Sequence, residues 1–547
     1  MNTATSYETL VVGGGIAGLT CGLRLAEQGV KVAILEKGET DRYLCNSRIC
    51  GGAFHVSYRD VMESPDILMN AMKGKTRGFS RQSFLDVMAN EPGKTVNWLK
   101  SKGLRFIKVG DAPHRRTTLA PPIATKGRDY WHGRGGDVML RTLHAELKKA
   151  GATLLLGTRA LNLRMAGGQC VGVEAEQNGA RVNLDARNVV ISDGGFQANL
   201  DMLKEYISPA PEKIRQRNAQ TAKGDGVKMA RAAGAKLVGM NRFYGHVLIQ
   251  DALTNDDLWP FPMMDEMCCA GVMVDTNGRR FVDEGAGGVF LANHIAGMQD
   301  PLSTIVVFDH PVWDGPAKEF ITPANPLLVT NGGTVHKANT ITELAQKLAL
   351  PAGALEQTIA QYNAAVDAGT TAQLTPARSV SSHKAWPVRT APFYAARLCA
   401  GITYTMGGIA IDGDSRVLDA NDNFLKALGY TLAEIKGQHH RIFVDRAEHD
   451  GAAYREFWQK LRSGEFLAGE FRRSAKNGHD VWIQASYNPV FDKAGKVVRV
   501  VKFAADITAA STQLTAALTS LRSQAQSFGS NLSTVQIRQD FTKAMIN

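Results

Sequence analysis

The feature of this sequence that most restricts its fold is a glycine-rich turn between two short apolar segments. Residues 10–12 (Leu-Val-Val) predict a strand, residues 13–18 (Gly-Gly-Gly-Ile-Ala-Gly) a turn, and residues 19–28 a helix. Residues 30–35 predict a second strand, and Glu36 follows it directly. A strand, a glycine turn, a helix and a second strand make one βαβ unit of a Rossmann-type, doubly wound α/β fold.

This unit predicts a dinucleotide site. Glycines allow a tight turn and a close approach of the backbone to a pyrophosphate, whose charge is stabilised by the helix N-terminus. The carboxylate of Glu36 stands where it can accept hydrogen bonds from a ribose, which disfavours a 2′-phosphate. The alternative is a glycine-rich turn without a ligand. The cofactor-binding candidates of this unit are Gly13, Gly15, Ala17, Gly18, Glu36 and Lys37.

Composition restricts the partners of the chain. Its 547 residues are 44% hydrophobic and 21% charged, which is ordinary for a globular protein of several domains. We find no bilayer-spanning apolar run and no signal-peptide pattern, and we expect a cytoplasmic protein without a membrane segment. The net charge of +11 is not gathered into long Lys/Arg runs. We therefore expect anionic small molecules or a solvated basic face rather than nucleic acid.

The seven cysteines are scattered along the chain and form no CxxC pair. This pattern argues against a disulfide framework and against a metal site. We expect Cys268 and Cys269 to be small buried residues.

Further loops add candidates for the cofactor site. Residues 46–53 follow the second strand and contain Gly51 and Gly52, whose backbone could approach the cofactor; the alternative is a plain loop. Residues 189–196 predict a buried strand that ends in Asp193 and Gly194, where a doubly wound sheet meets its ligand. The Gly-Asp-Gly at 224–226 predicts a turn before a helix, with a cofactor contact as the alternative.

The pattern changes between residues 240 and 371, which predict an inserted α+β domain. Residues 271–284 alternate around Asn277-Gly278, which predicts a two-residue hairpin turn between two strands. Residues 342–365 are predicted to be helical. A strand pattern returns at residues 392–395, within a return segment, 372–412, to the first domain.

Taken in order, these motifs resemble the flavoprotein family of fumarate reductase and succinate dehydrogenase, and within it the tricarballylate dehydrogenase-like enzymes. The resemblance covers about residues 5–414. It implies FAD in a Rossmann-type domain, residues 1–239, with the inserted domain, 240–371, as a cap over the flavin. It implies hydride transfer between flavin and a C–C bond of a small carboxylate substrate. The electron donor or acceptor is not identified by the sequence.

The same resemblance implies the catalytic candidates. Arg280, in Asn-Gly-Arg-Arg-Phe, takes the place of a proton shuttle; the alternative is a hairpin surface pair with Arg279. His246 takes the place of a residue that orients a substrate carboxylate. Tyr404 and Thr405 precede Met-Gly-Gly, and Tyr404 replaces the histidine of fumarate reductases. Because a phenol carries no positive charge, this replacement argues against fumarate and for a related polycarboxylate, ketone or enoyl substrate.

The chain departs from that family after about residue 414. The expected C-terminal FAD segment, with its glycine-rich helix N-terminus and second substrate arginine, is not found, which puts catalytic activity in doubt. Residues 413–508 instead resemble a PAS domain of chemotaxis-receptor type, with a strand, short helices and three strands. The resemblance implies a haem, flavin or small ligand, or dimerisation alone. His439 and His440 are candidates for a haem ligand, and a solvated turn is the alternative.

Residues 509–547 predict a helical tail that resembles the C-terminal region of flagellin; the alternative is a generic amphipathic tail. Three unrelated families in one chain suggest a chimera. Three interpretations remain open: an FAD-dependent oxidoreductase with a sensory module, a redox or ligand sensor, and a composite without integrated function.

Overall fold

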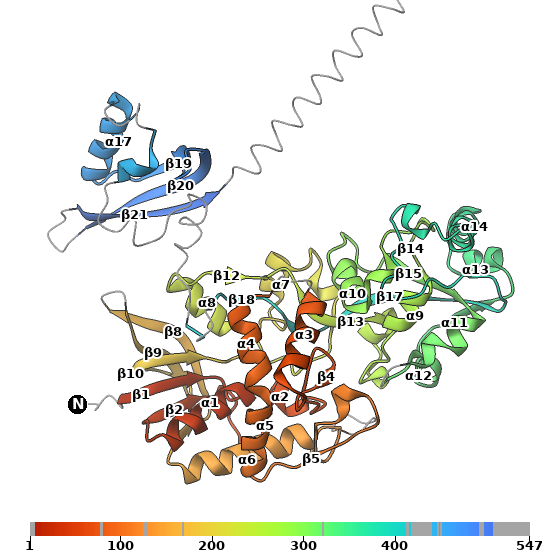
Figure 1. Cartoon of the computed structure of the whole chain (residues 1–547), viewed down its shortest axis with the longest axis horizontal. Helices are drawn as coiled ribbons and strands as arrows, with labels where there is room; N and C mark the ends of the chain where they lie inside the picture. The colour runs from red at the N-terminus through yellow and green to blue at the C-terminus, as the bar shows by residue number, and fades with distance from the viewer. Residues whose placement is uncertain are drawn as a thin grey trace, which may run out of the picture. The chain divides into compact units, whose positions relative to one another are not determined.

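A computed structural model describes residues 6–506 apart from 77–79, 124–129, 167–168, 320–321, 412–414, 417–439, 446–447, 449–450 and 492–496. The chain forms two compact units, 1–418 and 419–547, and each is described by itself (Figure 1). The predicted tail, 509–547, and His439 lie outside the described residues.

The first unit begins with the predicted βαβ unit. In its six-stranded sheet, the parallel strands β7, β2, β1 and β10 are followed by the antiparallel β9 and β8. The strands are β1 (Ser6–Val12), β2 (Val32–Leu35), β7 (Thr153–Leu155), β8 (Thr158–Ala166), β9 (Gln169–Gln177) and β10 (Ala180–Ile191). Side chains of β1 alternate between two cores, because Val11 packs on one face and Leu10 and Val12 on the other. Burial on both faces is typical of a central parallel strand.

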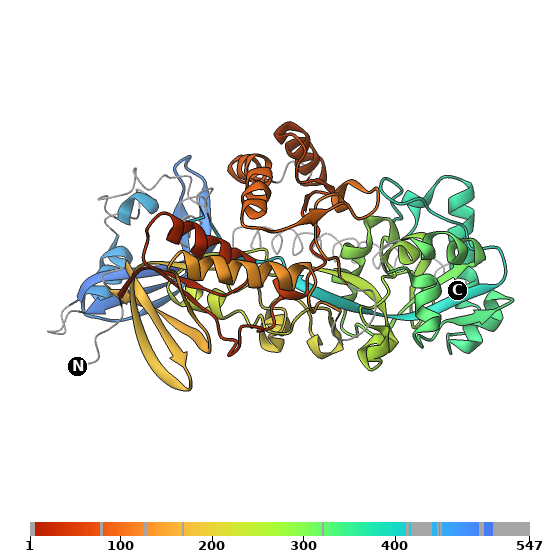
Figure 2. The same cartoon turned by 90° about the horizontal axis from the view of Figure 1, so that it is seen from below.

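Helix α1 (Ile16–Glu27) follows the glycine turn directly and begins three residues earlier than predicted. Helix α6 (Gly135–Lys149) lies alongside it and buries Met139, Leu140, Leu143 and Leu147 (Figure 2). The other helices of this part are α2 (Asn46–Ile49), α3 (Pro65–Thr76), α4 (Gln82–Asn90), α5 (Pro92–Ser101), α7 (Leu200–Tyr206) and α8 (Asp225–Ala232). Short strand pairs are β3 (His55–Val56) with β4 (Arg59–Asp60), β5 (Phe106–Ile107) with β6 (Thr118–Leu119), and β12 (Leu237–Val238) with β18 (Gly408–Ile409).

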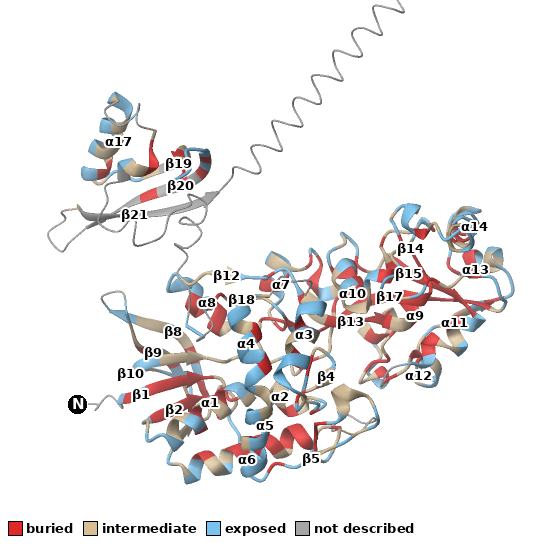
Figure 3. Ribbon diagram, viewed as in Figure 1, coloured by how far each residue is buried: buried red, intermediate tan, exposed pale blue. Residues whose placement is uncertain are grey.

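A second sheet forms the core of the inserted domain. Its central strand, β17 (Phe393–Thr405), pairs with β11, β13, β15 and β16, and β14 completes the edge. These strands are β11 (Arg215–Gln216), β13 (Phe243–Ile249), β14 (Val272–Asp275), β15 (Thr304–Asp309) and β16 (His336–Ala338). Its helices are α9 (Asp265–Ala270), α10 (Gly288–Ala296), α11 (His310–Asp314), α12 (Ala324–Thr330), α13 (Ile341–Lys347) and α14 (Ala354–Asp367). Buried residues run along this sheet as they do along β1 and β2 (Figure 3).

The helical segment predicted for residues 342–365 forms two helices, α13 and α14, because Pro351 and the left-handed Gly353 (φ 74°) interrupt it. The hairpin predicted at Asn277-Gly278 was wrong in part. Gly278 does form a turn (φ 73°), but the strand expected after it is reduced to one bridge between Val274 and Arg280. Cys268 and Cys269 are buried, as expected.

The second unit contains a three-stranded antiparallel sheet of β19 (Leu467–Ser474), β20 (Asp480–Phe491) and β21 (Val497–Asp506). Helix α17 (Ala452–Arg462) and the 3-10 helix His440–Phe443 precede the sheet. Leu461, Val481, Ile483 and Tyr487 are buried in a core of their own. This order of helix and strands agrees with the predicted PAS domain.

Candidate functional site

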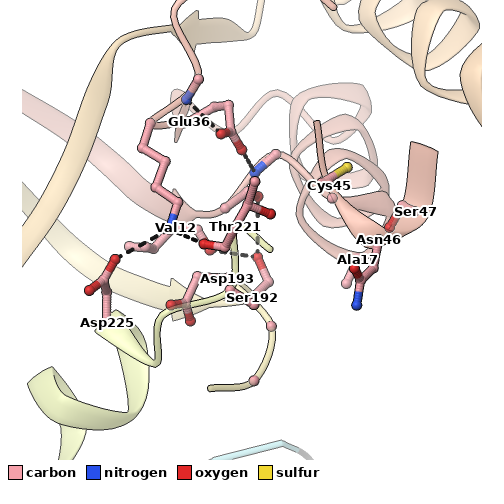
Figure 4. Close-up of a pocket in the computed structure, with 18 of the residues that line it drawn as sticks. Val12, Ala17, Glu36, Cys45, Asn46, Ser47, Ser192, Asp193, Thr221 and Asp225 are labelled. Atoms are coloured by element: carbon pink, nitrogen blue, oxygen red, sulfur yellow. Dashed lines mark hydrogen bonds and ion pairs between the residues drawn. The ribbon is translucent and has the colours of Figure 1, made fainter. Parts of the chain in front are cut away.

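A cavity of about 810 Å³ lies at the carboxyl ends of the parallel strands in the first unit. The β1–α1 turn, the end of β2 and the segment after β10 form its walls (Figure 4). Nine of the predicted site residues line it: Gly13, Gly15, Ala17, Glu36, Lys37, Asp193, Gly194, Tyr404 and Thr405. Strand topology explains this convergence, because a ligand of a doubly wound sheet binds where neighbouring strands end.

Glu36 holds the glycine turn in shape. Its carboxylate accepts hydrogen bonds from the backbone N–H groups of Gly14 and Gly38, both at 2.8 Å. The Tyr43 hydroxyl donates to the Gly14 carbonyl at 2.5 Å. Burial raises the pKa of Tyr43, so this hydroxyl stays a donor. The carboxylate is therefore fixed at the end of β2, beside the turn that would carry a pyrophosphate.

Gly13, Gly15 and Gly18 of the turn have different structural roles. Gly13 has a φ of 103°, which favours glycine, and a Cβ there would lie 2.6 Å from the Asp193 Cα. A Cβ on Gly18 would lie 1.9 Å from the Gly13 carbonyl oxygen, so this glycine lets α1 pack against the turn. A Cβ on Gly15 would meet only the Ser47 Oγ, at 3.3 Å. Of the three, Gly15 is the one whose missing side chain leaves room for a ligand.

Charged groups surround the opposite side of the cavity. The Lys37 ammonium donates to the Thr221 carbonyl at 2.5 Å and lies 3.4 Å from Asp225. Arg159 pairs with Asp225 at 2.8 Å. Burial raises the pKa of Asp193 to about 6, although it accepts a hydrogen bond from the Gly226 N–H. This network keeps the loops after β2 and β10 together.

Five predicted site residues do not line the cavity: Gly18, Gly51, Gly52, His246 and Arg280. Gly52 has a φ of 74° and packs against Leu119, which gives it a structural reason to be glycine. Sequence reasoning missed the lining residues Tyr43, Ser47, Arg159 and Thr221. The sequence feature that could have indicated Ser47 as a lining residue is its place in the small-residue segment 46–53. Asp225 lines the cavity in agreement with the alternative considered for residues 224–226.

Strand β17 connects this cavity to the inserted domain. Its last residues, Tyr404 and Thr405, line the cavity, and the Thr405 hydroxyl accepts a hydrogen bond from the Phe196 N–H at 3.0 Å. The Tyr404 ring stacks on Tyr244 of β13, with the ring centres 5.0 Å apart. The Tyr244 ring meets His246 edge-on at 5.2 Å. His246 is buried, and its Nδ1 lies 2.6 Å from the Asp265 carboxylate, which fixes the orientation of the ring.

Arg280 has a different environment. Its guanidinium donates to both oxygens of Glu284, at 3.0 and 2.5 Å, and to the carbonyls of Pro376 and Val282. Its side chain is 4% exposed and that of Glu284 is fully buried. Arg378 lies 3.9 Å from the same carboxylate. This is the geometry of a structural ion pair inside the inserted domain, and the proton-shuttle role stays a prediction.

The residues around the cavity suit FAD. The N-cap residue of α1, Gly15, has no side chain, so the start of the helix opens on the cavity, where a pyrophosphate would bind; the Ile16 N–H donates to the Ser47 Oγ at 3.0 Å. Residues 8–428 match the FAD binding domain family, and residues 417–504 match the PAS fold family. The chain belongs to the FAD binding domain family. It is a flavoprotein of the fumarate reductase type, followed by a PAS domain.

Known proteins resemble each part of this flavoprotein. An NADH:acrylate oxidoreductase of Vibrio harveyi is 29% identical over 383 residues, which are 66% of this chain and 35% of the relative. The biofilm dispersion protein BdlA of Pseudomonas aeruginosa is 46% identical over 107 residues, 20% of this chain and 26% of BdlA. The flavoprotein thus spans about a quarter to a third of the length of these two curated relatives.

The fold of the first unit also occurs in solved structures. A flavocytochrome c3 fumarate reductase in an open conformation superimposes with a TM-score of 0.53 at 22% identity, over 77% of this chain and 71% of that one. At this identity the likeness is one of fold. Within the part of the chain that the structure describes, no helix is both long and apolar enough to cross a membrane.

Proposed function

We propose that the flavoprotein reduces a carbon–carbon double bond conjugated to a carboxylate, or forms that bond in the reverse direction. The observation that supports this proposal most is the position of β17. This strand ends with Tyr404 and Thr405 in the cavity that begins at the glycine turn. A dinucleotide cofactor bound along the cavity would thus have its adenosine side at Glu36 and its redox end beside the inserted domain. The name of the Vibrio relative supports an acrylate-like substrate.

Each part of the cavity has a task in this proposal. Glu36 would accept hydrogen bonds from the ribose hydroxyls, and the start of α1 would stabilise the pyrophosphate. FAD, when bound, supplies hydride transfer at the double bond. The Thr405 hydroxyl accepts a hydrogen bond from the Phe196 N–H, which fixes the end of β17 beside the cavity. The Asp265 carboxylate fixes the ring of His246, which would orient a substrate carboxylate from the inserted domain.

Arg217 offers the positive charge that Tyr404 lacks. Its guanidinium donates to the Thr403 Oγ1 at 3.2 Å and to the Pro260 carbonyl at 3.3 Å, and its Nε is buried without a hydrogen-bond partner. It lowers the pKa of Tyr244 against the effect of burial, so it lies within electrostatic reach of Tyr244, on which the Tyr404 ring stacks. A substrate carboxylate at Tyr404 would be stabilised by this cation. We keep Arg280 as a proposed proton shuttle, with its ion pair to Glu284 as the competing structural role.

The test is oxidation of reduced methyl viologen by the purified, FAD-reconstituted protein in the presence of acrylate or fumarate. We expect substrate-dependent oxidation by the wild type, and none by Gly15→Val, which should not hold FAD. An Arg280→Ala variant with full turnover would eliminate the shuttle role alone. A flavin-loaded wild type without turnover on either acid would refute the proposed reaction.

The PAS match and its 46% identity to BdlA support a second candidate, a redox or ligand sensor. In that case the flavin would be reduced and reoxidised without turnover, and a haem, flavin or small ligand in the PAS domain would respond. Only the backbone of His440 is described, so no axial ligand is assigned. Absorbance spectra of the purified protein with and without dithionite separate a second chromophore from FAD.

We also propose the domain limits 1–239, 240–371, 372–412, 413–508 and 509–547. The central position of β17 in the second sheet supports attaching residues 393–405 to the cap as well as to the FAD domain. All seven cysteines are free thiols, which supports a reducing compartment such as the cytoplasm. A dimer through the PAS domain is our proposal for the oligomer, with light scattering as its measurement.

A further inference from the structure

A second, smaller cavity lies in the first unit, next to the cavity that begins at the glycine turn (the flavin cavity). Its volume is about 330 Å³. The segment after β2, the residues before α6, strand β11 with its following loop, and residues 256–259 of the inserted domain form its walls. Leu44 lines both cavities. All other residues of the second cavity lie outside the flavin cavity, and the proposed function gives them no task.

The wall between the two cavities is one layer of residues thick. Asn46 and Thr221 line the flavin cavity (Figure 4), whereas Ala219 and Gln220 line the second one. The Ala219 N–H donates to the Asn46 Oδ1 at 3.0 Å, and this hydrogen bond holds the wall together. The Asn46 amide nitrogen donates to the Thr403 carbonyl of β17 at 3.4 Å. The wall therefore stands where β17 ends, at the redox end that we propose for the cofactor.

Three aromatic side chains give the second cavity flat, apolar surfaces. They are Tyr130, Trp131 and Trp259. The rings of Tyr130 and Trp259 lie 5.6 Å apart at 48°, and Tyr130 is buried while both tryptophans are partly exposed. Leu44 and Ile49 add aliphatic surface. Such walls suit a ligand with a flat, mainly apolar ring.

The charges of the second cavity cancel. Among the described residues that line it, Arg215 and Asp256 are the two charged ones, and they form an ion pair with each other. The guanidinium also donates to the Leu253 carbonyl at 3.3 Å. A paired cation leaves no net charge to attract a phosphate or a carboxylate. The cavity therefore suits a neutral ligand.

The polar groups that remain are hydrogen-bond donors. The side-chain oxygen of Gln216 accepts from the Asn218 amide at 2.7 Å, which leaves the Gln216 amide nitrogen as a donor. In the described part of the chain, this nitrogen and the indole N–H of Trp131 have no acceptor. A ligand that supplies acceptors, such as carbonyl oxygens on a ring, satisfies these donors.

We propose that the second cavity binds a quinol and that the quinol passes its electrons to the flavin across the wall of Asn46 and Ala219. A quinone is a neutral, flat ring with two carbonyl acceptors, which is the chemistry that the walls and donors select. This inference rests on the proposed function and adds the source of its electrons. The quinol loses two electrons and two protons, and its two C–O single bonds become C=O bonds. The flavin gains both electrons and one proton, and the other proton goes to water.

Tryptophan fluorescence of the FAD-loaded protein, titrated with dimethylnaphthoquinone, measures binding. This quinone cannot add to the free cysteines, because its ring is already substituted. We expect saturable quenching by the wild type. Trp131→Leu should weaken binding at least about tenfold, since it removes an aromatic contact. Gln216→Leu removes the donor and keeps the size, and it should weaken binding about threefold or more. The matched control is Gln346→Leu on the exposed side of α13, which should bind as the wild type does.

Electron transfer is measured by reoxidation of the photoreduced flavin on adding the same quinone without oxygen. Trp131→Leu should slow reoxidation at low quinone concentration at least about tenfold, and should leave oxidation of reduced methyl viologen with acrylate within about twofold. Quenching that does not saturate, or binding and reoxidation that Trp131→Leu leaves unchanged, would overturn the inference. Viologen oxidation with acrylate but no quinone binding would leave the proposed function standing without this inference. Trp131-dependent quinone binding and flavin reoxidation without reduction of any alkene would do the reverse.

Discussion

A valine at position 15 should separate cofactor binding from folding. Gly15 has a φ of −71°, which any residue adopts, and a Cβ there meets only the Ser47 Oγ at 3.3 Å. The side chain would therefore extend into the cavity rather than into the protein. Loss of glycine's freedom in the unfolded chain offsets the small shift that Ser47 must make. We expect the free energy of unfolding of the apoprotein to change by less than about 1 kcal/mol.

The effect on FAD should be much larger. A valine side chain would hold the pyrophosphate away from the N–H groups at the start of α1. A hydrogen bond to a charged group contributes about 1.5–3 kcal/mol, so losing two of them costs about 3–6 kcal/mol. This corresponds to a weakening of FAD binding by about 10²- to 10⁴-fold.

Fluorescence titration of FAD with apoprotein measures the affinity, and urea unfolding of the apoprotein measures stability. Gly74→Ala in α3 is a control for both, because nothing lies within 4 Å of the added Cβ. Gly18→Ala is the opposite control and should impair folding, since its Cβ would lie 1.9 Å from the Gly13 carbonyl oxygen. FAD bound by Gly15→Val with wild-type affinity would refute the placement of the pyrophosphate at this turn.

Three further predictions concern stability. Burial raises the pKa of Asp193 to about 6, above its value of about 3.9 in the unfolded chain. Between these two pH values the folded protein binds a proton that the unfolded chain does not. The free energy of unfolding therefore falls as the pH rises from about 4 to about 6. The free energy of unfolding of Asp193→Asn should therefore exceed that of the wild type by about 3 kcal/mol above pH ~6 and should equal it below pH ~4. Urea unfolding that gives the same difference between the two proteins at both pH values would contradict this. Glu284→Gln leaves the buried Arg280 and Arg378 without their anion. It should lower the free energy of unfolding in urea by about 3–5 kcal/mol. The control Glu343→Gln, at the exposed ion pair with Lys347, should lower it by less than about 1 kcal/mol. Residues 413–508 expressed alone should melt cooperatively, because Leu461, Val481, Ile483 and Tyr487 form a separate core; a gradual loss of circular dichroism would show dependence on the rest of the chain.

The βαβ unit could be predicted because its signals are local. Gly13 needs a positive φ, β1 needs apolar residues on both faces, and Glu36 must follow β2 directly, and all three requirements appear within residues 6–36. The PAS strands were predictable for the same reason, since a turn at Lys476-Asn477-Gly478 joins two alternating segments. The helical prediction for residues 342–365 did not locate the break between α13 and α14, because Pro351 was given too little weight.

The rest of the site depends on contacts between distant segments. Tyr43 and Thr221 line the cavity from loops and Arg159 from the start of β8; none of the three belongs to a motif, and tertiary packing alone brings them together. The role of Arg280 was taken from a resemblance, and the sequence could not reveal that both carboxylate oxygens of Glu284, four residues later, accept hydrogen bonds from its Nε and Nη2.

Strand β17 makes the geometry of the flavin cavity depend on the inserted domain. Its 13 residues, Phe393–Thr405, measure about 40 Å at about 3.3 Å per residue. The ladders with β15 and β13 set the register of this length, and Thr405 is placed against Phe196 at its far end. An insertion of one residue in the inserted domain's half of the strand would turn every later side chain to the opposite face. Tyr404 and Thr405 would then exchange directions, so a shift of register within the inserted domain would change which side chain faces the cavity.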